Sequence, residues 1–228
     1  MKKPQFVSDQ IYHIYNRGVE KRKIFLDDTD YPRFIHDLFE FNDIAPAGKF
    51  STVGDRIPDS FKKAKKRELL VEILAFCLMP NHFHLLLRQL TENGIVRFMH
   101  KLGVGYTMYF NEKNKRVGPL FQGRFKAVLI DKEPHFYYLP YYIHVNPLEI
   151  RMPNWKEEGI KDYRKAGQFL SSYRWSSYLD YIGKKNFPSV ISKKFLTEIW
   201  GSPQDYKSDM EKWLKDFSLE EISKEIME

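Results

Sequence analysis

The sequence lacks the features that tie a protein to extracellular or membrane chemistry. It has one cysteine among 228 residues, which excludes a disulfide framework within the chain and suits a reducing compartment. No apolar run approaches the roughly 20 residues that a bilayer-spanning helix needs. We therefore expect a cytoplasmic protein without a membrane partner.

Several motifs of catalysis and cofactor binding are also missing. The chain has no Walker motif and no GxGxxG motif, so no nucleotide cofactor is indicated. It has no HExxH motif and no paired CxxC motif that would mark a zinc site. Any metal site must therefore be built from other residues.

What the sequence does have is apolar residues and positive charge. Hydrophobic residues make up 43% of the chain, which is enough for a sizeable core. There are 37 lysines and arginines against 30 acidic residues, a net charge of +7. This excess favours a polyanionic partner such as nucleic acid, although many basic proteins bind none. The basic run at 62–67 is typical of a solvated face.

Hydrophobic periodicity predicts alternating strands and helices. The predicted strands are 10–16, 71–78, 82–88 and 125–130, and the predicted helices are 28–42, about 94–111 and 133–145. This order favours an α+β fold of the ferredoxin-like sandwich type, an antiparallel sheet with helices packed on one face.

The remaining segments suggest how the chain is divided. Glycines, prolines and the basic run make about 43–69 an insertion loop. Short helices are predicted at roughly 192–200 and 203–217. We therefore expect a main domain at 1–182 and a small helical C-terminal extension at 183–228.

The chemically most informative motif is His82-Phe83-His84. Side chains alternate between the two faces of a strand, so the two imidazoles point the same way and Phe83 points into the opposite layer. Neutral imidazole is a common ligand for divalent metals. A bare His-x-His is more often an idle pair of sheet histidines. That alternative is weakened because burying two unpartnered imidazoles in an apolar strand is costly.

A second unusual segment, 137–146, holds four tyrosines. Tyr142 and Asn146 are four residues apart and share one face of a helix, as do Tyr138 and Tyr142. A free phenol has a pKa near about 10 and is a poor nucleophile at neutral pH, so a metal or base must assist it. The alternative is an aromatic stripe that packs against the sheet. Pro140 must start, kink or divide this helix.

Five motifs, taken in order, resemble a known family. They are YHIYNRG at 12–18, LMPNHFHLL at 78–86, LFQGRFK at 120–126, YIHVNP at 142–147 and WSSY at 175–178. Together they resemble the single-tyrosine HUH transposases, in the branch of the REP-associated tyrosine transposases. The resemblance covers roughly residues 8–182, and it makes the domain at 1–182 a catalytic domain of that type.

The resemblance implies a site and a reaction. His82 and His84 would bind a divalent metal, Mg²⁺ or Mn²⁺, and Asn146 would complete the metal site. Tyr142 would attack a DNA phosphodiester to give a 5′-phosphotyrosine and a free 3′-hydroxyl, and reversal would rejoin the strand. The implied partner is single-stranded or hairpin DNA with palindromic elements, which would place the protein at the nucleoid. The resemblance leaves a homodimer open, and Tyr138 is a second tyrosine that the family pattern does not require.

Four side chains are candidate DNA contacts: Arg17, Gln122, Arg124 and Lys126. The last three alternate with Phe121 and Phe125, and basic groups with interleaved aromatics suit single strands. The alternative is a charged strand edge with inward-facing phenylalanines. Two other functions stay open: a domesticated module that binds DNA or RNA hairpins without cleaving them, and a metal-dependent hydrolase whose histidines activate water.

Overall fold

The computed structural model of the chain describes residues 4–46 and 67–216. Most of the predicted insertion at about 43–69 lies outside these residues, as does the end of the C-terminal extension. Within the described part, no helix is both long enough and apolar enough to cross a membrane.

The core of the fold is one four-stranded antiparallel sheet. Its strands are β1 (Ile11–Arg17), β2 (Val71–Met79), β3 (His82–Gln89) and β4 (Lys126–Leu129), in the order β2-β3-β1-β4. β2 and β3 form a hairpin around Pro80 and Asn81, as the turn-forming pair predicts. The first three strands are rich in β-branched, aromatic and leucine side chains, which suit a sheet buried on both faces.

Two helices cover one face of this sheet. α1 (Asp30–Glu40) follows the short 3-10 helix η1 (Val19–Lys21), and α2 (Gly94–Lys113) connects β3 to β4. α1 packs against α2, and α2 packs against β2 and β3. The predicted ferredoxin-like α+β class is therefore confirmed, with two helices on one face of an antiparallel sheet.

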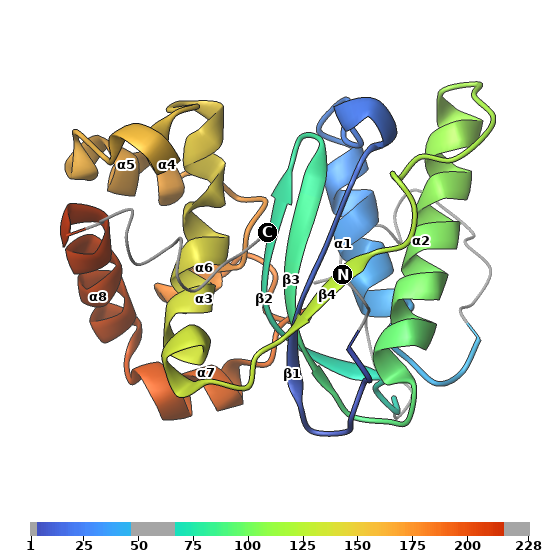
Figure 1. Ribbon diagram of the computed structural model, residues 1–228, viewed down its shortest axis with the longest axis horizontal. Helices are drawn as coiled ribbons and strands as arrows, with labels where there is room; N and C mark the ends of the chain where they lie inside the picture. Colours follow the sequence, from blue (N-terminus) through green and yellow to red (C-terminus); the bar gives the residue numbers. More distant parts are fainter. Residues whose placement is uncertain (1–3, 47–66, 217–228) are drawn as a thin grey trace.

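The opposite face carries a further helical layer, which a one-face arrangement did not include (Figure 1). α3 (Glu133–Val145) runs directly into η4 (Asn146–Ile150), and both contact β2. The outer helices are α4 (Trp155–Glu158), α5 (Tyr163–Leu170), α6 (Tyr178–Tyr181), α7 (Lys193–Trp200) and α8 (Pro203–Asp216). α4, α5 and α6 were not predicted; α4 and α6 have only four residues each, too few to show a periodic pattern.

α3 is fixed to this layer by a buried imidazole. Pro140 lies inside α3 without ending it. Four residues later, His144 is fully buried. Its Nδ1 lies 2.7 Å from the Tyr206 hydroxyl of α8, and its Nε2 lies 2.7 Å from Oγ of Ser177. The Phe76 amide of β2 in turn donates to Ser177 Oγ over 2.9 Å. One ring thus connects α3, α8 and the sheet.

The free edge of β2 is covered by the chain's own later segment. The Leu78 amide donates to the Trp175 carbonyl over 2.9 Å, and the Ser177 amide donates to the Phe76 carbonyl over 3.0 Å. Cys77 and Ser176 form an isolated bridge between them. The unpaired amides and carbonyls of an edge strand are thereby satisfied.

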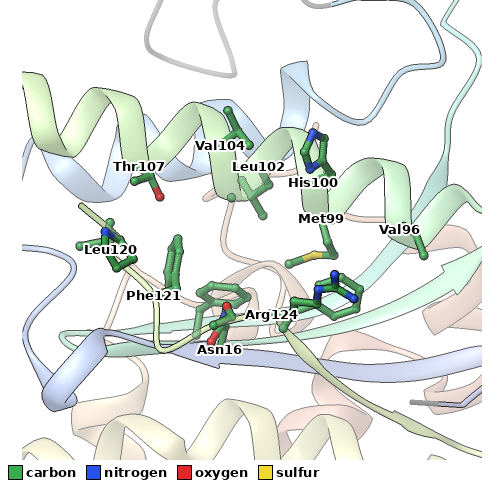
Figure 2. Close-up of a pocket in the computed structure, with 15 residues that line it drawn as sticks. Asn16, Val96, Met99, His100, Leu102, Val104, Thr107, Leu120, Phe121 and Arg124 are labelled. Atoms are coloured by element: carbon green, nitrogen blue, oxygen red, sulfur yellow. The ribbon is translucent and has the colours of Figure 1, made fainter. Parts of the chain in front are cut away.

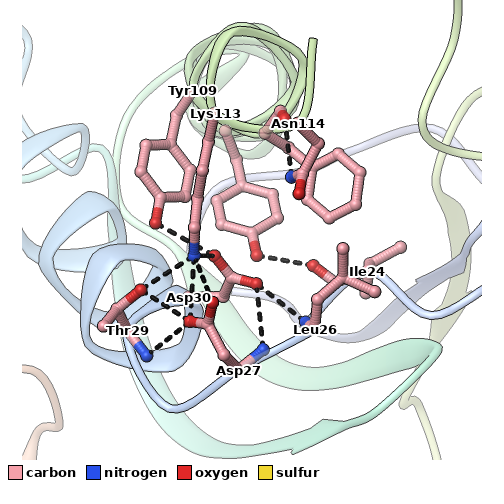
Figure 3. A network of polar contacts seen from close by, with 10 residues as sticks. Ile24, Leu26, Asp27, Thr29, Asp30, Tyr109, Lys113 and Asn114 are labelled. Atoms are coloured by element: carbon pink, nitrogen blue, oxygen red, sulfur yellow. Dashed lines mark hydrogen bonds and ion pairs between the residues drawn. The ribbon is translucent and has the colours of Figure 1, made fainter. Parts of the chain in front are cut away.

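An ionic network joins the ends of α1 and α2 on the other face (Figure 3). Lys113 Nζ lies 2.6 Å from the buried Asp30 carboxylate and 2.8 Å from Asp27. The Tyr109 hydroxyl donates to the same Asp30 carboxylate over 2.9 Å. Asp30 also accepts the Leu26 amide over 2.7 Å. A buried carboxylate needs such partners.

Candidate functional site

The sheet register gathers the candidate residues on one face. Tyr15 of β1 lies opposite both His84 of β3 and Lys126 of β4, so these three side chains form one row across the sheet. Arg17 lies opposite His82 in the neighbouring row. Since directly opposite residues share a face, both histidines and two of the predicted basic residues face the layer of α3.

These rows line an open pocket of about 610 Å³. Its walls contain both histidines of the motif and all four predicted DNA contacts: His82, His84, Arg17, Gln122, Arg124 and Lys126. Lys21 and Lys156 add positive charge, and Glu149 is the one acidic side chain of the lining. The pocket is therefore strongly basic and suits a phosphate-bearing ligand.

The predicted DNA contacts are held by local interactions. The Arg17 guanidinium donates to the side-chain oxygen of Gln122. The backbone N–H of Gln122 donates to the backbone carbonyl of Arg17 over 2.9 Å. Lys126 Nζ lies 5.7 Å from the centre of the Tyr15 ring, a cation–π distance. The segment before β4 is thus tied to the end of β1, and its polar groups face the pocket.

Both motif histidines are neutral imidazoles at physiological pH. Burial, together with the charges of Lys156 and Arg17, lowers the pKa of His82 to about 4. Burial also holds the pKa of His84 well below its usual range, with the neighbouring histidines and Lys156 acting in the same direction. A neutral ring keeps the nitrogen lone pair that a metal ligand must offer.

Each ring uses one nitrogen for a protein contact and leaves the other for a ligand. His82 Nδ1 lies 2.7 Å from Oδ1 of Asn81, and His84 Nδ1 lies 2.9 Å from Nε2 of His13. Asn81 can only accept through that oxygen, so His82 carries its proton on Nδ1. The same tautomer of His84 would donate to His13. Nε2 of His82 is then the nitrogen with a free lone pair, and Nε2 of His84 has one when His84 is the donor in its contact with His13.

α3 brings Tyr142 against this pair of histidines. The Tyr142 ring packs edge-on against His84, with centroids 6.0 Å apart, and against His13 at 6.4 Å. The ring is only 2% exposed. The Tyr138 ring stacks on Tyr142, with centroids 6.5 Å apart, and contacts Trp213. Of the two phenols four residues apart, Tyr142 is the one that contacts the histidines.

Asn146 follows the last residue of α3 and is fully buried. Its Nδ2 donates to the Tyr142 carbonyl over 2.7 Å, four residues back. Its Oδ1 is buried without a hydrogen-bond partner among the described residues, which is costly unless a ligand meets it. In that part of the chain, no three His, Cys, Asp or Glu side chains converge to hold a metal. A site on the two histidines therefore needs a ligand of another type, and an amide oxygen with water or substrate oxygens meets that need.

Two residues of the site were missed in the sequence. Lys156 of α4 lies with Nζ 3.4 Å from the Tyr142 hydroxyl and 3.7 Å from Glu149. No motif surrounds it, so no sequence signal could have found it. His13 stands within the first of the five motifs, but its contact with His84 depends on strand register. The signal available in the sequence was a histidine inside the first predicted strand.

Comparison with known proteins gives a match to one family over part of the chain. Residues 50–146 match the family model "Transposase IS200 like", which confirms the resemblance found in the motifs. No curated protein matches the chain. Among solved structures, it is similar to one described as "Structure of the REP associates tyrosine transposase bound to a REP hairpin". That match has 14% identity, covers 84% of this chain and 90% of the other, and has a TM-score of 0.49. A likeness this distant carries no argument on function.

Proposed function

Since residues 50–146 carry the sequence pattern of the IS200-like transposases, we propose that this protein cuts and rejoins single-stranded, hairpin-containing DNA. The observation that carries the proposal is the contact between α3 and β3. Tyr142 packs on His84, and the motif histidines line a basic pocket. A phenol, two neutral imidazoles and a cationic surface are what a tyrosine-dependent phosphoryl transfer requires.

The reaction exchanges one phosphodiester for another. The Tyr142 oxygen forms a bond to the phosphorus, and the bond to the 3′-oxygen of the neighbouring nucleotide breaks. The phenol loses its proton, and the departing 3′-oxygen gains one. The product is a 5′-phosphotyrosine with a free 3′-hydroxyl. Because the phosphoester is conserved, another 3′-hydroxyl can reverse the step and rejoin a strand.

His82, His84 and Asn146 are the residues that would hold a divalent metal, Mg²⁺ or Mn²⁺. Their free Nε2 atoms and the unpartnered Oδ1 fit such an ion. A bound divalent ion supplies Lewis-acid polarisation of a phosphate oxygen.

Lys156 would assist the nucleophile directly. Its ammonium lies 3.4 Å from the Tyr142 hydroxyl, where a positive charge stabilises negative charge on the attacking oxygen. Arg17, Gln122, Arg124 and Lys126 would position the DNA backbone around the pocket.

The proposal predicts a covalent protein–DNA adduct. Incubation with labelled hairpin DNA and Mn²⁺ should give a band of reduced mobility on a denaturing gel. Tyr142→Phe and a chelator should each abolish the band, because one removes the nucleophilic oxygen and the other removes the metal. Tyr138→Phe is the matched control, four residues away on the same helix, and should retain it. An adduct that survives Tyr142→Phe and is lost in Tyr138→Phe would show that the other phenol is the nucleophile.

A second function is favoured by one observation. Tyr142 is 2% exposed and is not among the residues that line the basic pocket, so a protein that binds hairpin DNA or RNA without cleaving it would fit the same surface. A native gel beside the denaturing gel separates the two functions. Tight hairpin binding on the native gel with no adduct on the denaturing gel under any metal condition would support binding alone.

A further inference from the structure

His13 is a third histidine beside the two motif histidines, on the same face of the sheet. It is 2% exposed and stands on β1, two residues before Tyr15, which lies opposite His84. Asn16 is on the other face of β1 and lines the apolar pocket between α2 and residues 119–125 (Figure 2). His13 therefore belongs to the layer of α3 and the basic pocket, and not to the layer of α2.

His13 contacts His84 without itself lining the basic pocket. Nε2 of His13 lies 2.9 Å from Nδ1 of His84, and the two ring planes are inclined by only 18°. The proton of one nitrogen and the lone pair of the other can therefore face each other along the line between them, which favours a well-aligned hydrogen bond. Of the two rings, His84 lines the basic pocket and His13 does not. His13 is therefore placed to act on a metal through His84, and not as a ligand.

The hydrogen bond between these rings can form in two ways, which leave His84 with different properties. Both rings are buried, and burial disfavours the charged imidazolium. A neutral imidazole has one donor and one acceptor nitrogen. If His84 donates from Nδ1, its Nε2 keeps the lone pair that a metal ligand must offer. If His13 donates instead, the proton of His84 lies on Nε2 and blocks that position.

His82 shows how the protein settles the same choice at the other ligand. Its Nδ1 lies 2.7 Å from Oδ1 of Asn81, and Nδ2 of Asn81 donates to the Lys21 carbonyl over 3.4 Å. Because an amide oxygen only accepts, His82 carries its proton on Nδ1 and its lone pair on Nε2. At His84, the group that meets Nδ1 is His13. A two-histidine metal site needs His13 to act there as Asn81 acts at His82.

We propose that His13 is the positioning residue of His84 and accepts its Nδ1 proton, so that Nε2 stays available to the divalent metal. The proposal rests on the proposed function and adds a residue to its metal site. A metal on Nε2 leaves Nδ1 as the only place for the ring proton. Without an acceptor, that buried N–H would be unpaired, which opposes metal binding.

His13→Leu and His13→Gln separate this role from packing. Leucine fills the space with a side chain that accepts no hydrogen bond, whereas the amide oxygen of glutamine can reach the position of Nε2 and accept one. Calorimetry with Mn²⁺ should show binding weaker by about 10–100-fold in His13→Leu, the usual cost of losing a partner of a metal ligand. His13→Gln should bind Mn²⁺ nearly as tightly as the natural protein. Equal affinities in the two variants, both folded in thermal unfolding, would overturn the proposal.

A second measurement needs no metal. NMR of nitrogen-labelled histidine side chains reports which ring nitrogen carries the proton, and the signals of His84 are identified by their loss in His84→Gln. In the natural protein the proton of His84 should lie on Nδ1. In His13→Leu it should move to Nε2, where water in the pocket can accept it. A natural protein with the proton of His84 on Nε2 would overturn the proposal, whether or not the variants of His13 fold.

The outcomes for the natural protein distinguish this proposal from the proposed function. Equal Mn²⁺ binding by the natural protein and His13→Leu, alongside normal formation of the covalent adduct, would overturn the role of His13 and leave the proposed function standing. A natural protein that neither binds Mn²⁺ nor forms the adduct would overturn the metal site, and the role of His13 with it.

Discussion

The two faces of β3 serve different purposes. On one face, Phe83 is buried against Phe34 of α1 and Phe121. On the other, His82 and His84 meet Tyr142 and line the basic pocket. Of three consecutive residues, Phe83 thus belongs to the core beside α1, and His82 and His84 belong to the site beside α3. A shift of one residue in register would exchange the two sets.

Burial alone does not separate the site from the scaffold. His144 is buried like His84, and burial lowers its pKa to about 3. However, both of its ring nitrogens are occupied by hydroxyl groups, from Tyr206 and Ser177. His82 and His84 each leave Nε2 for a ligand. A ring nitrogen without a protein contact therefore distinguishes a candidate metal ligand from a structural histidine. A lowered pKa does not, because both kinds of histidine have one.

Truncation of neighbouring residues of β3 tests whether its two faces differ in their contribution to stability. Phe83→Ala should lower the free energy of unfolding by about 3–5 kcal/mol, because it opens a cavity between β3 and α1. His82→Ala should lower it by less than about 1 kcal/mol, since this partly exposed ring faces the pocket. Chemical denaturation measures both. Equal losses would mean that the two faces are not distinct.

In metal binding, the order of the two substitutions should be reversed, with the larger effect at His82. His82→Ala should weaken Mn²⁺ binding in calorimetry at least about tenfold, a loss of about 1.4 kcal/mol, because a ligand is gone. Phe83→Ala, measured where it is folded, should bind Mn²⁺ as the natural protein does. Unchanged binding in His82→Ala would contradict the proposed metal site.

Replacing the structural histidine should have a smaller effect on stability. His144→Phe leaves the Tyr206 hydroxyl without its partner, whereas Ser177 keeps its contact with Phe76, and a buried unpaired polar group costs about 1–3 kcal/mol. We expect a loss of about 2 kcal/mol in the free energy of unfolding. His135→Phe, a partly exposed position on the same helix, is the control and should change it little. A His144→Phe protein of natural stability would show that α3 is held to α8 by apolar packing alone.

The smallest expected effect is the loss of stability at low pH that follows from protonation of Asp27, beside α1 and α2. Hydrogen bonds from Lys113 and Thr29 lower the pKa of Asp27 from 3.8 to about 2. Because this carboxylate binds its proton less readily in the folded state, its stabilisation is present above pH 3.8 and is lost as the pH falls through about 2. The side chain is 52% exposed, so the effect should stay below about 1 kcal/mol.

The comparison of Asp27→Asn with the natural protein measures this contribution. The variant should be slightly less stable near neutral pH, and the two stabilities should converge near pH 2. Asp28→Asn, at the neighbouring exposed carboxylate, is the matched control. A difference between Asp27→Asn and the natural protein that persists at pH 2 would assign the effect to something other than the charge.

Much of the fold could be predicted because its elements have strong periods. β1, β3 and α2 begin and end within a few residues of their predicted bounds, since their apolar residues recur at strand or helix spacing. α4 and α6 could not be predicted, because a four-residue turn such as Trp155–Glu158 shows no period. The predicted boundary at 182 remains a proposal, although His144 and Tyr206 connect the segments on its two sides.

The site was predictable where one element contains the pattern. His82 and His84 share a strand face, as their spacing predicts. Asn146 begins η4, and its side chain reaches back to the Tyr142 carbonyl. Contacts between elements were not accessible. The 2.9 Å contact between His13 and His84 depends on the pairing of β1 with β3. The approach of Lys156 to Tyr142 depends on how η4 and α4 fold back, and no local pattern encodes that path.

The segment that covers β2 has a consequence for shortened forms of the protein. Residues 175–177 hydrogen-bond to the outer edge of the sheet, and the Ser192 amide continues the cover at Ile73 over 2.9 Å. A truncation that ended after η4 would keep every proposed ligand and the nucleophile. It would also expose an apolar strand edge that can pair with other chains. Such a fragment should aggregate, so the smallest soluble unit is longer than the smallest set of site residues.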